Sequence, residues 1–107
     1  MQHITSITEF KEKIVERASF PLFVKTDNCS VCDGLKPQVE AFEKDYTVPF
    51  YAANAAKLPG LAGKLLLFAA PVVLLFHEGK EIQRFARFVP LEELRGRLDE
   101  LEEGLHV

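Results

Sequence analysis

The sequence predicts an α/β fold, in which a central mixed sheet of four or five strands is covered by helices on both faces. Two observations support this class. Strand patterns and helix patterns alternate through the first half of the chain, and a strand hairpin followed by a helix completes the second half. Because the 107 residues contain no internal repeat or linker, we expect residues 1–107 to form a single domain.

The composition is that of an ordinary soluble protein, with 48% hydrophobic residues, 27% charged residues and a formal net charge of -3. This charge provides no basic surface, so we expect neither nucleic acid nor a membrane as a partner. The first residues lack the basic and apolar regions of a signal peptide, which favours a mature chain that begins at Met1 and a cytoplasmic location.

The first quarter of the chain predicts a helix and a buried strand. Ser6 and Glu9 have the spacing of a capping box, which predicts a helix that runs to about Ala18. Residues at helical spacing would form its apolar face: Ile7, Phe10, Ile14 and Val15. Residues before Ser6 could add a short edge strand. Residues 20–26 are apolar on both faces, which predicts a buried strand and a parallel arrangement.

A second helix is predicted from Cys29 to about Tyr46, because apolar residues recur there at steps of three and four. Pro37 falls inside this helix and should kink it. Residues 48–53 then predict a strand, and residues 58–66 predict a short helix with two glycines.

The second half predicts an antiparallel hairpin and a last helix. Residues 72–77 and 82–88 read as strands on either side of a glycine-containing turn over 78–81. Pro90 would take the first position of the last helix, and Gly104 would end it. Five leucines at helical spacing form its apolar stripe: Leu91, Leu94, Leu98, Leu101 and Leu105.

Aromatic and histidine side chains outside the cysteine motif are interpreted as structural. We expect six phenylalanines to lie in the core: Phe20, Phe23, Phe68, Phe76, Phe85 and Phe88. Of these, Phe68 could also reach the rim of a substrate groove. The three histidines, His3, His77 and His106, are expected to be exposed.

The two cysteines of the chain, Cys29 and Cys32, stand between the buried strand and the second helix. One helical turn separates them, which puts their Cα atoms about 5 Å apart, within the range of a disulfide. Unpaired N–H groups and the positive end of the helix favour a thiolate on Cys29, so we expect Cys29 to be the nucleophile. Cys32 lies one turn further in and could resolve a mixed disulfide formed on Cys29.

Spacing alone leaves other interpretations of this pair open. A structural zinc site needs four ligands, and the histidines are scattered without ligand spacing, so we expect no metal. A cluster shared across a dimer, or an inert pair of thiols in a binding domain, is compatible with the same spacing. No cofactor is expected.

Three features between Phe20 and the last helix occur together in one known family. The motif Cys29-Ser30-Val31-Cys32 opens a helix after a buried strand, Pro37 lies five residues beyond the second cysteine, and residues 70–80 combine a proline, a strand and a glycine turn. In these features the chain resembles the thioredoxin superfamily. The resemblance implies a three-layer thioredoxin-like fold and thiol–disulfide oxidoreductase activity.

The same resemblance implies a substrate-binding site. Pro71 would be a cis-proline beside the cysteines, and the backbone of Ala70 would be free to pair with an extended substrate segment. Asn28, Ser30 and Val31 would contribute to the surface on which the substrate lies.

The chain departs from thioredoxins proper, which carry Trp-Cys-Gly-Pro-Cys-Lys. Asn28 precedes the first cysteine, Asp33 follows the second, and the chain contains no tryptophan. The buried acid to which the family assigns proton transfer from the resolving thiol falls on Phe23 here. Asp27 and Asp33 flank the motif and could replace that acid through water, but we interpret both as solvated surface carboxylates.

We therefore expect the chain to reduce protein disulfides in the cytoplasm through a Cys29/Cys32 dithiol–disulfide cycle. Its expected partners are disulfide-containing protein substrates and a thiol or thioredoxin-reductase-type electron donor, and we expect a monomer. The alternative is a redox switch or protein-binding module of the same fold without efficient turnover. The missing tryptophan and buried acid keep this alternative open.

Overall fold

The computed structural model describes residues 1–104. Its elements follow one another as β1 (Gln2–His3), α1 (Ile7–Val15), β2 (Phe20–Lys25), α2 (Ser30–Glu40), the short 3-10 helix η1 (Glu43–Asp45), β3 (Tyr51–Asn54), α3 (Pro59–Lys64), β4 (Val72–His77), β5 (Lys80–Ala86) and α4 (Leu91–Glu102). This alternation confirms the predicted α/β class.

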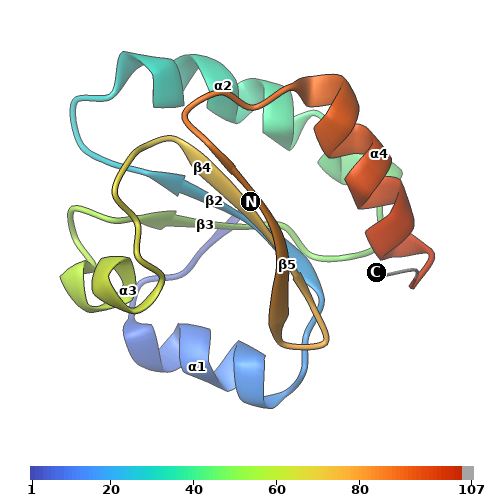
Figure 1. The fold of residues 1–107 in the computed structure, drawn as a ribbon, viewed down its shortest axis with the longest axis horizontal. Helices are drawn as coiled ribbons and strands as arrows, with labels where there is room; N and C mark the ends of the chain where they lie inside the picture. Colours follow the sequence, from blue (N-terminus) through green and yellow to red (C-terminus); the bar gives the residue numbers. More distant parts are fainter. Residues whose placement is uncertain (105–107) are drawn as a thin grey trace.

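The five strands form one mixed sheet in the order β1-β3-β2-β4-β5. Strand β3 pairs in parallel with β1 and β2, whereas β4 pairs antiparallel with β2 and β5. Helices α2 and α4 lie on one side of the sheet, and α1 and α3 lie on the other (Figure 1). The three-layer arrangement that the resemblance implied is therefore confirmed.

The core consists of two apolar clusters, one on each face of the sheet. Because successive residues of a strand point to opposite faces, Phe23 of β2 lies in the cluster beneath α2 and α4. Its neighbours Leu22 and Val24 lie in the cluster beneath α1 and α3. This double coverage explains why the sequence of β2 is apolar throughout.

The predicted N-cap of α1 at Ser6 is confirmed, but the reciprocal bond of a capping box goes to Thr5 and not to Ser6, and the helix is shorter than expected. The Ser6 Oγ accepts a hydrogen bond from the Glu9 N–H (3.1 Å), and the Glu9 carboxylate accepts one from the Thr5 N–H. The helix ends at Val15, which is 80% exposed and therefore does not belong to the apolar face. Val15 follows Ile14 by one residue, a rotation of about 100° that turns it toward solvent.

Several other boundaries differ from the predicted ones. The second helix ends at Glu40 and not near Tyr46, although Pro37 lies inside it as predicted. Strand β3 begins at Tyr51 because Pro49, two residues earlier, has no N–H to donate to a ladder. The short helix covers Pro59–Lys64.

The hairpin turn is tighter than predicted, with only Glu78 and Gly79 between the strands, both at positive φ. Strand β5 therefore covers Lys80–Ala86 and ends two residues before Phe88. Pro90 precedes the first residue of α4 as its N-cap. The predicted positions of Leu105 and His106 lie outside the described residues.

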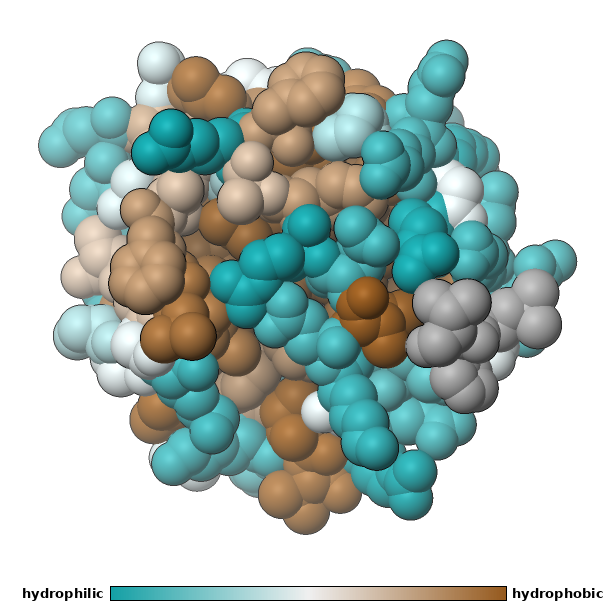
Figure 2. Space-filling model, in the orientation of Figure 1, coloured by the Kyte–Doolittle hydropathy of each residue, from teal (hydrophilic) through white to brown (hydrophobic). Residues whose placement is uncertain are grey.

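Burial corrects three of the sequence expectations. His77 is only 8% exposed, because it ends β4, a central strand that is buried along its whole length. Phe68 and Phe88 were expected in the core but are 87% and 78% exposed, since both lie in segments outside the strands. Figure 2 shows hydrophobic side chains gathered where α2 begins and where the chain enters β4 and leaves β5.

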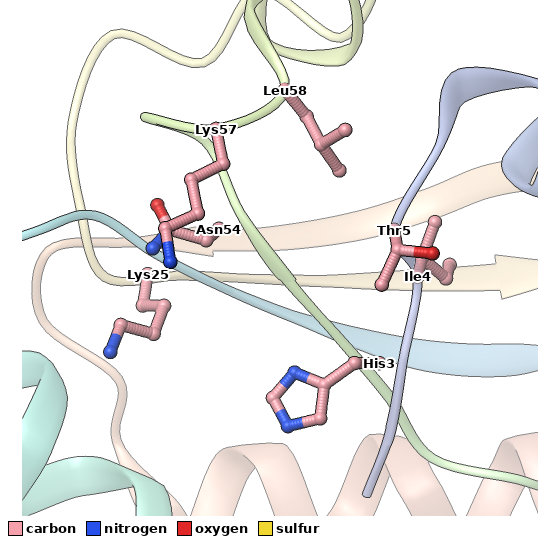
Figure 3. A pocket seen from close by; sticks show the side chains of 7 residues that line it. All are labelled: His3, Ile4, Thr5, Lys25, Asn54, Lys57 and Leu58. Carbon is pink, nitrogen blue, oxygen red and sulfur yellow. The ribbon is translucent and has the colours of Figure 1, made fainter.

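The carboxyl ends of the three parallel strands β1, β3 and β2 lie at the same end of the sheet. At this end the chain passes from β2 into the cysteine motif. A cavity of about 340 Å³ lies at the same end, beside the ends of β1 and β3 (Figure 3).

Candidate active site

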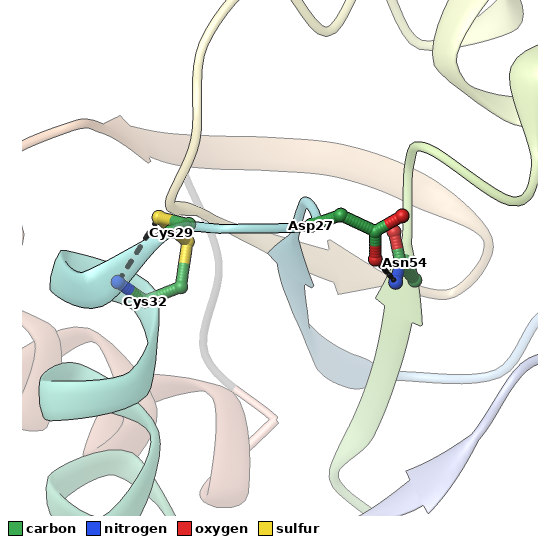
Figure 4. Close-up of a disulfide and its surroundings, with 4 residues drawn as sticks. All are labelled: Asp27, Cys29, Cys32 and Asn54. Carbon is green, nitrogen blue, oxygen red and sulfur yellow. Dashed lines mark hydrogen bonds between the residues drawn. A yellow bond between two sulfur atoms is a disulfide. The ribbon is translucent and has the colours of Figure 1, made fainter.

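The cysteine motif begins where β2 ends and α2 starts. Cys29 is the N-cap of α2 in extended conformation, and the N–H of Cys32 donates a hydrogen bond to the Cys29 Sγ (3.1 Å; Figure 4). Asn28 stands before it at φ 55°, a left-handed conformation that asparagine tolerates better than most residues. A short turn after β2 thus places Cys29 at the N-terminus of α2, where the backbone N–H groups have no partner within the helix.

The two sulfurs are joined in a disulfide, and the Cα atoms are 5.2 Å apart, in agreement with the separation expected from one helical turn. The two cysteines differ in burial. Cys29 is half-buried and reachable from solvent, whereas Cys32 is 1% exposed. An incoming molecule can therefore reach Cys29 but not Cys32.

Cys32 lies in an apolar environment. The cluster that contains it is formed by aliphatic and aromatic side chains, with Phe23 on β2 and Ala52 on β3 as register partners beneath the motif. The position where the family has its buried acid is thus occupied by a fully buried phenylalanine. No aspartate or glutamate is among the buried residues within 1–104.

The Ala70-Pro71 segment lies next to the same cluster. The peptide bond between these residues is cis, Pro71 is buried, and Ala70 packs against the cluster that contains Cys32. The N–H of Arg87 donates a hydrogen bond to the Pro71 carbonyl (2.7 Å), which holds the segment after β5 beside the proline. Within residues 1–104, no backbone hydrogen bond involves Ala70.

The remaining residues that were predicted to bind substrate lie on the surface around Cys29. Asn28, Ser30 and Val31 are exposed, and Val31 is unusually so for an aliphatic side chain, at 62%. The fold therefore brings the cysteine motif and the Ala70-Pro71 segment to one end of the sheet, as the resemblance implied.

The two acids that flank the motif are exposed. Asp27 accepts a hydrogen bond from the Asn54 side-chain amide (2.9 Å) and points away from the cysteines in Figure 4. Asp33 stands on the outer surface of α2. This agrees with our interpretation of both as surface carboxylates.

Sequence reasoning missed Arg84, which binds the backbone of the segment that leads to Pro71. Its guanidinium donates hydrogen bonds to the carbonyls of Leu65 (2.9 Å) and Leu66 (3.4 Å), in the segment that leads to Pro71. Hydrogen bonding to Glu81 raises the pKa of Arg84 above its ordinary value. An arginine on an edge strand gives no sequence signal of such a partner, because the contact joins residues 18 and 19 positions apart.

None of the helices within 1–104 has the length and apolar character that a bilayer crossing needs. In the same part of the chain, no group of three or more histidine, cysteine, aspartate or glutamate side chains is arranged to hold a metal ion.

A disulfide-bonded cysteine pair at the start of a helix, on a mixed five-stranded sheet and next to a segment with a cis-proline, is typical of the thioredoxin class of proteins. Comparison with known proteins agrees. The chain is 30% identical over 89 residues to the thioredoxin-like protein YdfQ of Bacillus subtilis, a match that covers 81% of this chain and 80% of that one. It is 37% identical over 59 residues to mitochondrial thioredoxin-2 of Schizosaccharomyces pombe, covering 54% of this chain and 44% of the relative.

The X-ray structure of Fasciola hepatica thioredoxin shares the fold, with a TM-score of 0.83 over 94% of this chain and 98% of that chain, at 21% identity. No protein-family model matches the sequence. The chain belongs to the thioredoxin superfamily, as a thioredoxin-like protein with a Cys-Ser-Val-Cys motif. At the level of the family, this similarity and the cysteine pair support a thiol–disulfide oxidoreductase.

Proposed function

We propose that this protein is an enzyme that reduces protein disulfides, with Cys29 as the nucleophile and Cys32 as the resolving thiol. The observation that carries the proposal is the hydrogen bond from the Cys32 N–H to the Cys29 Sγ at the N-terminus of α2. In the reduced protein, this donor and the positive end of the helix dipole would both stabilise negative charge on that sulfur.

In the first step, the Cys29 thiolate attacks one sulfur of a substrate disulfide. A bond forms between Cys29 and that sulfur, the substrate disulfide breaks, and the second substrate sulfur leaves as a thiolate that takes a proton from water. The greater exposure of Cys29 supports its assignment to this step.

In the second step, Cys32 loses its proton and attacks the Cys29 sulfur. The Cys29–Cys32 disulfide forms, and the mixed disulfide breaks to release the second substrate thiol. The substrate has then gained two electrons that the cysteine pair has lost, and a thiol or a reductase-type donor must return them. The Cα separation of 5.2 Å lets this disulfide form between residues one turn apart.

The apolar surroundings of Cys32 make the second step the harder one. Since Phe23 occupies the position of the family's buried acid, the proton of Cys32 has no buried carboxylate within residues 1–104 to receive it. The proton must pass to the departing substrate sulfur or to water at the Cys29 surface. We therefore expect resolution, and not the first attack, to limit turnover.

Substrate binding is assigned to the surface around Cys29. The unpaired backbone of Ala70 beside Pro71 can hydrogen-bond an extended segment, and the exposed Asn28, Ser30 and Val31 lie next to the reacting sulfur in sequence. The substrates would be disulfide-containing proteins, and the protein would act on them as a single-domain monomer. In the cytoplasm, the reducing environment favours the reduction of these disulfides.

The direct test is reduction of a disulfide-bonded protein with dithiothreitol as the electron donor. Cys29→Ser should abolish turnover, whereas Cys32→Ser, reduced and then mixed with the substrate after dithiothreitol has been removed, should accumulate a mixed disulfide with it. Thr8→Ser, which changes an exposed hydroxyl side chain on α1, serves as a control and should leave turnover unchanged. Wild-type turnover in the Cys29 variant would refute the assignment.

The alternative is a redox switch or protein-binding module without efficient turnover. The absence of a buried acid among residues 1–104 is the observation that favours it. A switch would change its conformation or its affinity for a partner between the oxidised and reduced forms, while the reduction assay showed no catalysis.

A further inference from the structure

The cavity at the carboxyl ends of β1, β2 and β3 is separate from the cysteine pair. Residues from three segments line it: His3, Ile4, Thr5, Lys25, Asn54, Lys57 and Leu58. Neither cysteine is among them. In open α/β sheets, the crevice at the carboxyl ends of parallel strands is a common place for ligands, and about 340 Å³ is within the size range of small-molecule sites.

The walls of this cavity are held in place by the backbone. The Ile4 N–H donates to the Ala52 carbonyl (2.8 Å), which ties the segment after β1 to β3. The Ala55 N–H donates to the Lys25 carbonyl (2.8 Å), which ties the end of β3 to the end of β2. The cavity is therefore a preformed feature of this end of the sheet.

Its lining combines an apolar part with two lysines and a histidine. Ile4 is buried and Leu58 is half-buried, so both offer carbon atoms to a ligand. Lys25, Lys57 and His3 line the rest of the cavity. Figure 3 shows both lysine side chains on one side and Ile4 on the other, with the His3 ring directed toward the lysine side. Within residues 1–104, none of the side chains of Lys25, Lys57 and His3 forms an ion pair or hydrogen bond.

Two carboxylates lie near the cavity but do not line it. Asp27 is held by the Asn54 amide (2.9 Å), and Glu9 is held by the Thr5 N–H and hydroxyl (3.1 Å each). Hydrogen bonds from Thr5 lower the pKa of Glu9, so Glu9 is ionised at neutral pH. These acids bind the polar lining residues and leave both lysines without a partner inside the protein.

We propose that this cavity binds a small molecule that joins an anionic group, either a carboxylate or a phosphate, to an apolar group. Lys25 and Lys57 would bind the anionic group, His3 would donate a hydrogen bond to it, and Ile4 and Leu58 would contact the apolar part. The protein carries a net charge of -3, so a cavity with two unpaired lysines is a local exception to its overall charge. Neither cysteine takes part in this binding, because neither lines the cavity.

The test is a titration of the whole chain, followed by the amide signals in two-dimensional NMR, with four probes: phenyl phosphate, benzoate, inorganic phosphate and neutral benzyl alcohol. We expect saturable shifts confined to residues 3–5, 25 and 54–58 with phenyl phosphate or benzoate, and the stronger of the two identifies the anionic group. Lys25→Met and Lys57→Met should each weaken binding roughly fivefold. Lys57→Arg should retain it.

Lys64→Met is the matched control, because Lys64 is an exposed lysine of α3 that does not line the cavity. The Lys64→Met variant should bind the anionic probe with the affinity of the wild type. Added salt should weaken this binding for the wild type and for every variant that binds the probe. The proposal is overturned if no probe gives saturable shifts up to about 10 mM, a weak limit for a small-molecule site. Equal binding of benzyl alcohol or of inorganic phosphate, or equal weakening by the Lys64 variant, would also overturn it.

Discussion

The two ends of the sheet differ in how many of their polar groups form hydrogen bonds or ion pairs within the protein. At the hairpin end, formed by residues 16–19 and 78–79, the turns bind each other. The Gly79 N–H donates to the Ala18 carbonyl (2.9 Å), the Glu78 N–H donates to the Ser19 hydroxyl (3.0 Å), and Arg17 forms an ion pair with Glu78 (3.2 Å). This end is closed by contacts within the chain.

The cysteine end is formed by residues 26–31, 66–71 and 86–89. It leaves backbone hydrogen-bonding groups unpaired and apolar side chains exposed. The backbone of Ala70 makes no hydrogen bond within residues 1–104, and Phe68 and Phe88 expose most of their rings. Exposed apolar side chains gathered around one site are typical of a surface that binds another molecule. The comparison indicates that packing within the chain constrains the hairpin end, whereas the cysteine end leaves apolar side chains and a backbone segment exposed.

The largest expected effect is a loss of stability at the hairpin end. In Gly79→Ala, the new Cβ would lie 2.6 Å from the Ile14 carbonyl oxygen, and the residue would keep a φ of 82° that alanine rarely adopts. We expect unfolding in denaturant to show a loss of about 2–3 kcal/mol. Gly96→Ala, inside α4 with nothing within 4 Å, should instead stabilise the protein by about 0.5–1 kcal/mol. Equal stability of the two variants would contradict the comparison.

At the cysteine end, the expected effect is on activity and not on stability. The double variant Phe68→Ser/Phe88→Ser should lower kcat/KM for protein disulfides about fivefold to tenfold, because it removes apolar contact area beside Pro71. Its free energy of unfolding should change by less than about 0.5 kcal/mol. Val15→Ser, which alters an equally exposed residue on α1, is the control. The idea fails if reduction of a small disulfide falls as much as reduction of a protein.

A variant of Arg84 tests whether hydrogen bonds from β5 hold the segment that leads to Pro71 in place. Arg84→Met removes the hydrogen bonds to the carbonyls of Leu65 and Leu66, which should cost about 1 kcal/mol. Hydrogen exchange should become faster for the amides of residues 65–71 and stay unchanged at the hairpin end. Arg97→Met provides the comparison, since the ion pair of Arg97 with Glu100 lies within its own helix. Unchanged exchange in residues 65–71 would show that the arginine does not hold this segment.

The smallest expected effect concerns α4, which is tied to the segment before β3. The Glu102 carboxylate accepts hydrogen bonds from the Thr47 N–H and hydroxyl and from the Val48 N–H. These bonds, with Thr47 as the main cause, lower the pKa of Glu102 below its ordinary value of 4.5. Because the folded pKa is the lower one, the stabilisation is present above pH 4.5 and is lost as the pH falls through the folded pKa.

Glu102→Gln should therefore cost up to about 1 kcal/mol at neutral pH, and less in acid, where the wild-type carboxylate is protonated as well. Thermal unfolding at several pH values measures the difference. Glu103→Gln, a change at the neighbouring exposed carboxylate, is the control. A difference between wild type and Glu102→Gln that stays constant down to low pH would contradict this account.

Much of the fold could be predicted because the signals are local. The capping box at Ser6, the apolar run of β2 and the leucine stripe of α4 each depend on spacings of a few residues, and the corresponding elements are present. The separation of the cysteines follows from helix geometry alone, and the observed 5.2 Å agrees with it. The expectation for Pro71 depended on a resemblance, and its cis bond is confirmed.

The rest could not be predicted, because burial and cavities depend on which strands become neighbours. His77 is buried since β4 lies between β2 and β5, and Phe88 is exposed since the two-residue turn ends β5 earlier than expected. The lysines at residues 25 and 57 meet at one cavity only through the pairing of β2 with β3. The sequence by itself determined the order of elements and the chemistry of the cysteine motif, because spacing along the chain sets both. Only the tertiary structure decided which groups are paired within the protein and which remain unpaired at its surface, since those contacts join residues far apart in the chain.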